Sequence, residues 1–133
     1  MDNGREGALA REELRRAALV TGASRGIGRA IACGLAADGF DVALVYAGNA
    51  EAAAEAVAEC EAAGATARAY RCDVANADEA KATVDAVLAD FGSVWALVNN
   101  AGITRDTLLA RMKDEDFASV IGVNLTGAFN MTR

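Results

Sequence analysis

The 133-residue sequence contains no histidine, only three cysteines and few aromatic residues, which make up 5% of the chain. Without histidine, the chain can form neither a Ser-His-Asp triad nor a zinc site with histidine ligands. The cysteines, Cys33, Cys60 and Cys72, form no C-x-x-C pair, and we interpret them as small buried residues in a reducing compartment. The sequence therefore predicts no metal site.

An excess of positive charge and long apolar runs are also missing. The 13 basic and 19 acidic residues give a net charge of −6, which argues against a sequence-independent nucleic-acid surface. No stretch is long enough to span a bilayer, and the polar residues 1–16 lack the apolar centre of a signal peptide. We therefore expect a cytoplasmic protein without a nucleic-acid or membrane partner, in which residues 1–14 form a flexible lead-in.

Short apolar segments alternate with amphipathic ones along the rest of the chain, and 53% of all residues are apolar. The pattern predicts strands at 17–20, 41–46, 66–72 and 94–98, separated by helices at 25–38, 50–63 and 77–91. Strands and helices in alternation predict an α/β fold, a Rossmann-type doubly wound parallel sheet truncated after four strands, in the order 3-2-1-4. Ligands of such sheets bind at the carboxyl ends of the strands, beside the point between strands 1 and 4.

Local signals mark the ends of these helices. Glycines follow the three predicted helices, and Asn49 and Asn76 are candidate N-caps, with Glu79 as the capping-box partner of Asn76. The helix at 77–91 should bury one face, made of Val84, Val87, Leu88 and Phe91. After a loop at 99–106 we expect a helical region that carries Leu108, Leu109, Met112, Phe117, Val120 and Val123.

The segment 21–28 reads TGASRGIG and connects the first strand to the first helix. Such a turn directs backbone N–H groups and the positive end of a helix dipole at one spot, which suits a phosphate. Gly22 permits the tight turn, Gly26 lets the backbone approach a diphosphate, and Gly28 lets helix and strand pack closely. The spacing differs from the G-x-G-x-x-G fingerprint, so a corner packed with small residues is the alternative. The unusual segment 99–102, NNAG, should meet this loop at the same crevice, which favours a ligand site.

Four motifs together resemble the short-chain dehydrogenase/reductase family: TGASRGIG, Cys72-Asp73-Val74, NNAG at 99–102 and Val123-Asn124-Leu125. The resemblance extends over residues 17–133. Within that family, NNAGITRDTLLARM at 99–112 is most similar to the 3-oxoacyl-[acyl-carrier-protein] reductases.

The resemblance implies a nicotinamide cofactor and a set of residues that bind it: Gly22, Ser24, Arg25, Gly26, Ile27, Gly28, Asp73, Val74, Asn100, Ala101 and Gly102. Asp73 and Val74 would face the adenine ring, and residues 100–102 would line the ribose region. Asn124 would be catalytic, because its main chain would help to hold a water in the proton relay. Thr21 and Asn99 would tie strands 1 and 4 together. As alternatives, Asp73, Asn99 and Asn100 are turn residues, and Asn124 is a helix asparagine whose side chain is satisfied.

The end of the second strand indicates which nicotinamide cofactor would bind. NAD-binding relatives carry an acid about twenty residues after the glycine loop, whereas residues 45–49 read VYAGN and Asp41 lies at the wrong end of the strand. The missing carboxylate removes a source of repulsion for the extra phosphate of NADP, and Arg25 offers a guanidinium to bind it. We therefore predict NADP(H). A solvent-facing Arg25 is the alternative.

The resemblance implies NADPH-dependent reduction of 3-oxoacyl-[acyl-carrier-protein] to the 3-hydroxyacyl form in fatty acid biosynthesis, with the acyl thioester on its carrier as partner and a homotetramer at full length. The family's chemistry needs a serine and a Tyr-x-x-x-Lys pair. Neither Tyr46 nor Tyr70 is followed by lysine four positions later. We therefore expect 15–133 to be an NADP-binding half-domain, incomplete at its C-terminus and inactive alone. The alternatives are a reductase of acetoacetyl-CoA or another small ketone, and a non-catalytic NADP-binding or interaction module.

Overall fold

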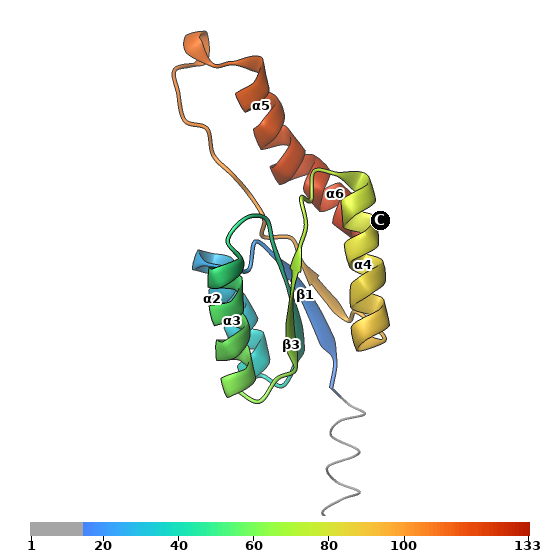
Figure 1. Ribbon diagram of the computed structural model, residues 1–133. Coiled ribbons are helices and arrows are strands. Elements are labelled where there is room, and N and C mark those ends of the chain that lie inside the picture. Colours follow the sequence, from blue (N-terminus) through green and yellow to red (C-terminus); the bar gives the residue numbers. More distant parts are fainter. Residues whose placement is uncertain (1–14) are drawn as a thin grey trace, which may run out of the picture.

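The computed structural model describes residues 15–133, so the predicted lead-in at 1–14 lies outside the described residues. Its centre is a parallel sheet of the four strands β1 (Ala17–Thr21), β2 (Asp41–Tyr46), β3 (Ala67–Arg71) and β4 (Ala96–Val98) (Figure 1). The strand order is β3-β2-β1-β4, which confirms the predicted topology. The sheet belongs to the Rossmann-like α/β class. β1 is buried along its whole length, because it lies in the middle of the sheet.

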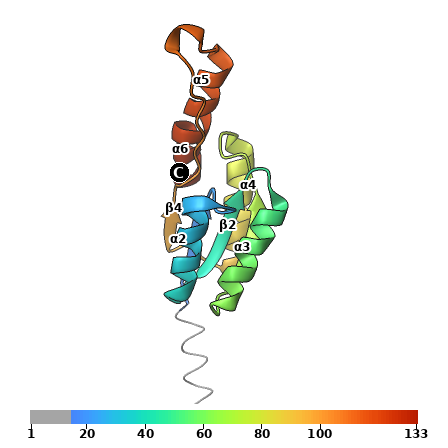
Figure 2. The same cartoon turned by 90° about the vertical axis from the view of Figure 1, so that its left-hand side faces the viewer.

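Helices cover both faces of this sheet (Figures 1 and 2). On one face, α2 (Gly26–Ala37) and α3 (Ala50–Ala62) bury small side chains against Val20, Val42 and Leu44. On the other face, α4 (Ala77–Phe91) and α6 (Gly127–Thr132) pack over Leu19, Val45 and Val74. The sheet is therefore a two-sided core, which explains why its central strands read as continuous apolar runs.

The helices end and begin close to the predicted positions. Gly39, Gly64 and Gly92 follow α2, α3 and α4 with φ of 97°, 94° and 82°, a left-handed conformation that favours glycine at a helix end. Asn76 caps α4 by accepting from the backbone N–H groups of residues 78 and 79. The predicted capping box is wrong in one respect. The Glu79 carboxylate accepts from the N–H of Asp73 at 3.4 Å, because the Asn76 N–H donates to the Asp73 carbonyl instead.

The buried face of α4 agrees with the prediction at Val84, Val87 and Phe91, which pack against the core, and differs from it at Leu88. Ala80, Thr83 and Val87 are buried, whereas Leu88 is 41% exposed. The small side chains let α4 approach the sheet closely, and Leu88 lies on the flank of the buried stripe. α4 also holds the edge strand β3, since Asp90 accepts from the Tyr70 hydroxyl at 2.5 Å and pairs with Arg68 at 3.1 Å.

The last third of the described chain extends beyond the sheet (Figures 1 and 2). A long loop leads to the 3-10 turn η1 (Leu109–Arg111), then to α5 (Asp114–Ile121), the π-helical turn η2 (Gly122–Thr126) and α6. Leu108 and Leu109 begin the region that was predicted to be helical. They lie just before and within the 3-10 turn η1, and their side chains are 69% and 85% exposed. α6 returns to the sheet, where Met131 is buried and the Asn130 side chain donates to the Val74 carbonyl at 2.9 Å.

A small aromatic cluster lies at the amino-terminal end of the sheet. The Trp95 backbone N–H donates to the Ala17 carbonyl at 2.9 Å, and the indole packs 5.5 Å from the Phe40 ring. The Arg16 guanidinium lies 4.7 Å from the centre of the same indole, which is 58% exposed. Cation–π contact of this kind holds the start of β1 against the start of β4. Among residues 15–133, no helix has the length and apolar character needed to cross a membrane.

Candidate functional site

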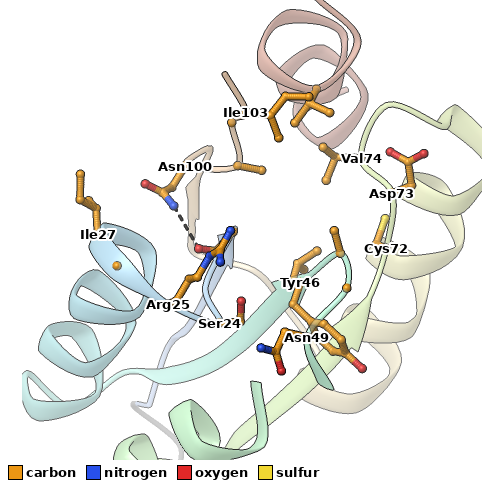
Figure 3. Close-up of a pocket in the computed structure, with 18 residues that line it drawn as sticks. Ser24, Arg25, Ile27, Tyr46, Asn49, Cys72, Asp73, Val74, Asn100 and Ile103 are labelled. Carbon is orange, nitrogen blue, oxygen red and sulfur yellow. Dashed lines mark hydrogen bonds between the residues drawn. The ribbon is translucent and has the colours of Figure 1, made fainter. Parts of the chain in front are cut away.

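A cavity of about 490 Å³ opens at the carboxyl ends of the strands, where the loops after all four strands meet (Figure 3). This position is the one that the strand order predicts for a ligand. The lining includes ten of the eleven residues predicted to bind a cofactor: Gly22, Ser24, Arg25, Gly26, Ile27, Asp73, Val74, Asn100, Ala101 and Gly102. The three motifs that carry these residues therefore form one cleft.

The loop between β1 and α2 forms one wall of the cleft. Gly22 and Gly26 have φ of 63° and 58°, so both need the conformational freedom of glycine. A Cβ added to Gly26 would meet no other atom within 4 Å, and it would project into open space. Arg25 occupies the N-cap position of α2 without a capping side-chain bond, so the first N–H groups of the helix face the cleft uncapped. Ile27 is 74% exposed at the same rim.

Gly28 is the exception among the predicted cofactor-binding residues, because it does not line the cavity. A Cβ at Gly28 would overlap the Gly22 carbonyl oxygen and lie 2.5 Å from the Asn100 Nδ2 atom. No side chain fits between these atoms. The residue acts on the cleft through packing, by letting the first turn of α2 approach the β1 loop and the loop after β4.

Thr21 and Asn100 join the loops after β1 and β4. The buried Thr21 Oγ1 accepts from the N–H groups of Asn100 and Ala101 at 3.0 and 2.9 Å, and donates to the Val98 carbonyl at 3.4 Å. The Asn100 side chain donates to the carbonyls of Thr21 and Gly22, each at 3.2 Å. Asn99 was predicted to join strands 1 and 4, and this prediction is wrong, because the Asn99 side chain donates to Thr132 of α6 at 3.1 Å. Asn100 joins the two strands instead.

Asp73 and Val74 form the opposite wall, after β3 (Figure 3). Asp73 Oδ1 accepts from the Ala75 N–H at 3.0 Å, so the side chain does shape the turn before α4, as the alternative interpretation had it. It also lines the cavity, where a carboxylate can accept from an amino group. Among the described residues of the lining, Arg25 and Asp73 carry the charges, and they stand on opposite sides of the cleft.

Other residues of the lining were not predicted as site residues: Val45, Tyr46, Ala47, Gly48, Asn49, Cys72, Ile103 and Val123. Those at 45–49 follow β2, and the general rule that sites form at the carboxyl ends of parallel strands was the signal that could have found them. None of these five is acidic, so the end of β2 presents no carboxylate to the cavity. Burial raises the pKa of the Cys72 thiol, which keeps it neutral and a weak nucleophile.

Asn124 lies in the π-helical turn η2 and does not line the cavity. Its side chain accepts from the Ile103 N–H at 2.8 Å and donates to the Ile103 carbonyl at 3.0 Å. The two bonds hold the loop after β4 at the position where Ile103 contacts the cleft. The side chain is thus satisfied, as the alternative interpretation had it. The role of the Asn124 main chain in holding a water stays a prediction.

A family model described as short chain dehydrogenase matches residues 16–133. The chain belongs to this family. The short-chain dehydrogenase match covers the whole α/β unit, from the start of β1 to α6.

Individual relatives agree with this assignment. The chain is 52% identical to 3-oxoacyl-[acyl-carrier-protein] reductase of Staphylococcus aureus over 118 residues, 89% of this chain and 48% of the relative. It is 46% identical to acetoacetyl-CoA reductase of Shinella zoogloeoides over 117 residues, 88% of this chain and 46% of that one. A short-chain dehydrogenase/reductase from Burkholderia phymatum, solved in complex with NAD, superposes with a TM-score of 0.85 and 37% identity, covering 90% and 42% of the two chains. The chain thus spans about half the length of the relatives it matches.

Proposed function

We propose that this chain is the cofactor-binding half of an NADPH-dependent reductase that converts 3-oxoacyl thioesters on acyl carrier protein to 3-hydroxyacyl thioesters. The observation that carries the proposal is the cleft itself, in which the TGASRGIG loop, Asp73-Val74 and the NNAG loop face one another. The 52% identity to a 3-oxoacyl-[acyl-carrier-protein] reductase supports the substrate class.

The residues of the cleft suit a dinucleotide. The open space at Gly26 and the uncapped start of α2 form a cradle for a diphosphate, because backbone N–H groups and the helix dipole both favour an anion there. Asp73 would accept from the adenine amino group, and residues 100–102 would line the ribose next to the nicotinamide. The Gly28 contact keeps the two glycine-rich loops close enough to form a single binding surface.

The end of β2 favours NADP(H) over NAD(H). A carboxylate at this position would bond the free ribose hydroxyls of NAD and repel the additional phosphate of NADP. The cleft has uncharged residues at 45–49, while Arg25 forms no salt bridge to any described carboxylate. Its guanidinium is therefore available to a phosphate.

The reduced nicotinamide, when bound, would supply the hydride of the reaction. The chain's own contribution is to bind and orient it. The Asn124 side chain fixes Ile103, and the main chain of η2 would help to hold a water in the proton relay. Neither tyrosine of the chain is followed by lysine four positions later, and we propose that the serine and the Tyr-x-x-x-Lys pair of this family's proton transfer are absent from this chain. We therefore propose that the chain binds the cofactor but does not turn over substrate alone.

A second substrate is favoured by one specific observation, the 46% identity to acetoacetyl-CoA reductase. Both substrates are 3-oxoacyl thioesters and differ in the carrier, so the same cofactor half would serve either one. A cytoplasmic location stays a prediction. The predicted homotetramer is supported by exposed apolar side chains along α5 to α6, namely Phe117, Ile121, Leu125 and Phe129.

Titration with NADPH and NADH, followed by the fluorescence of the reduced nicotinamide, tests the cofactor proposal. We expect NADPH to bind more tightly than NADH. Arg25→Ala should reduce this preference about tenfold, since it removes charge-assisted hydrogen bonds to the extra phosphate. Arg29→Ala is the matched control, because Arg29 lies four residues after Arg25, in the first turns of α2, but pairs with Glu55 and Glu59 of α3. Equal affinities of the unaltered chain for the two cofactors would refute the NADP assignment.

The reaction is tested by mixing the purified 133-residue chain with NADPH and an acetoacetyl thioester. We expect no oxidation of NADPH above the blank, because the chain contains no Tyr-x-x-x-Lys pair to protonate the product. Turnover would show that the proposed division between binding and catalysis is wrong. The coding sequence downstream of Arg133 separates the functional classes: a serine followed by Tyr-x-x-x-Lys indicates an enzyme, and an in-frame stop favours a binding module.

A further inference from the structure

Arg71, the last residue of β3, contacts the loop that follows β2. Its Nε donates to the Ala47 carbonyl at 3.2 Å, and Ala47 lines the cleft. The strands keep this contact in register, because Arg71 is the Cα partner of Tyr46 and the Cys72 N–H donates to the Tyr46 carbonyl at 2.9 Å. An arginine at the edge of the sheet is thereby fixed beside the rim of the cavity.

The hydrogen bond to Ala47 uses only the Nε of Arg71. Among residues 15–133, no carboxylate forms a salt bridge with its guanidinium, and its two terminal nitrogens have no hydrogen-bond partner in the protein. Arg68 on the same strand behaves differently, because it pairs with Asp90 at 3.1 Å. One of the two β3 arginines is thus neutralised against α4, whereas the other keeps its charge beside the cleft.

In a dinucleotide-binding fold, the position of Arg71 places its guanidinium near the adenosine ribose of the cofactor. The adenosine ribose of the cofactor lies at the end of β2, so its 2′-substituent faces the loop at 46–49. Arg25 and residues 45–49 line the same cavity. The Ala23 N–H donates to the Val45 carbonyl at 3.1 Å and holds the β1 and β2 loops side by side. A phosphate at that point would face no carboxylate from residues 45–49. Arg25 is part of the same lining, and Arg71 contacts the lining residue Ala47.

We propose that Arg71 is a specificity-determining residue, whose terminal nitrogens bind the 2′-phosphate of NADP(H) from the β3 side while Arg25 binds it from the β1 side. The inference rests on the proposed function, since it requires that NADP(H) is the cofactor. It adds a residue from the edge strand, which none of the motifs of the sequence includes. A guanidinium held by a backbone carbonyl is pre-organised for a phosphate, because its orientation is fixed before the ligand arrives.

The test uses the full 133-residue chain and two variants with the same change of charge. Arg71→Gln removes the proposed phosphate contact, and Arg68→Gln removes a neighbouring cation that pairs with Asp90. We expect Arg71→Gln to raise the dissociation constant of NADPH about tenfold, which corresponds to the low end of the range for a charge-assisted hydrogen bond. The dissociation constant of NADH should stay within about twofold, because NADH has no 2′-phosphate. Arg68→Gln should leave both constants unchanged. Adenosine 2′,5′-bisphosphate and adenosine 5′-monophosphate, measured as competitors, should repeat this pattern without the nicotinamide.

Each other outcome overturns a different statement. If Arg71→Gln weakens NADPH and NADH equally, Arg71 only supports the β2 loop and the specificity role is refuted. If it changes neither constant, Arg71 does not touch the ligand. If the unaltered chain shows no preference for NADPH, the proposed cofactor fails and this inference fails with it. A preference for NADPH that is as large in Arg71→Gln as in the unaltered chain refutes the inference alone. Circular dichroism of both variants shows that the measured chains are folded.

Discussion

Thr21 offers a sharp test of how the two glycine-rich loops are held together. The side chain is 1% exposed, and its hydroxyl is the junction of three hydrogen bonds between the ends of β1 and β4. Thr21→Val keeps the shape of the side chain and removes the hydroxyl. Within residues 15–133, Thr21 Oγ1 is the acceptor that the structure gives to the Ala101 N–H.

The cost can be estimated from the partners. The Ala101 N–H would lose its acceptor at 2.9 Å, whereas the Asn100 N–H would keep a second acceptor, the Val98 carbonyl at 3.1 Å. An unsatisfied backbone N–H costs about 1–3 kcal/mol and a weakened one about 0.5–1 kcal/mol. Loss of the long 3.4 Å hydrogen bond from Thr21 to the Val98 carbonyl adds little to this cost. We therefore expect Thr21→Val to lower the free energy of unfolding by about 2–4 kcal/mol, a large part of the stability of a small domain.

Urea unfolding followed by far-UV circular dichroism measures this loss. Thr21→Ser is the matched control, because it keeps the hydroxyl and loses one methyl group, which costs about 1 kcal/mol. NADPH titration of Thr21→Val should also show weaker binding, since residues 100–102 lose an anchor. A valine variant as stable as the serine variant would refute the role assigned to the hydroxyl.

Two further predictions concern α2. Gly28→Ala should destabilise the fold by about 3 kcal/mol or more, because a Cβ has no room there; Gly34→Ala, on the same helix with no atom within 4 Å, should instead stabilise it by about 0.5–1 kcal/mol in urea unfolding. A destabilised Gly34→Ala would contradict this contrast. Burial and the neighbouring Glu59 carboxylate raise the pKa of Cys33 to about 12, so the thiol is neutral below that pH. Its alkylation by iodoacetamide, measured by mass spectrometry, should rise about tenfold per pH unit without a plateau below about pH 10, and an earlier plateau would count against the raised pKa.

The order of the strands could be predicted because local signals agree with one topology. The apolar segments at 17–20 and 41–46 require burial on both faces, and Gly39, Gly64 and Gly92 mark helix ends through a backbone conformation that favours glycine. The glycine loop, the NNAG segment and the CDV segment were sufficient to predict ten residues that line the cleft. These features are local in sequence, so a sequence pattern contains them.

Other features depend on neighbours that no local pattern specifies. Leu88 was expected in the core, but hydrophobicity does not say which flank of an amphipathic stripe is covered. Asn99 and Asn100 have the same chemistry, and only the path of the backbone after β4 decides which of them reaches Thr21. The contact between Arg71 and Ala47 depends on the register of β2 against β3, which the sequence alone left open.

The aromatic cluster at the start of β4 gives the molecule a built-in optical probe. Trp95 is the one tryptophan of the chain, and it lies at the opposite end of the sheet from the cleft. Its emission therefore follows the stacking of Arg16 and Phe40, while the emission of a bound reduced nicotinamide follows the carboxyl ends of the strands. When both emissions are measured in one sample, they distinguish a variant that no longer binds the cofactor from a variant that has begun to unfold.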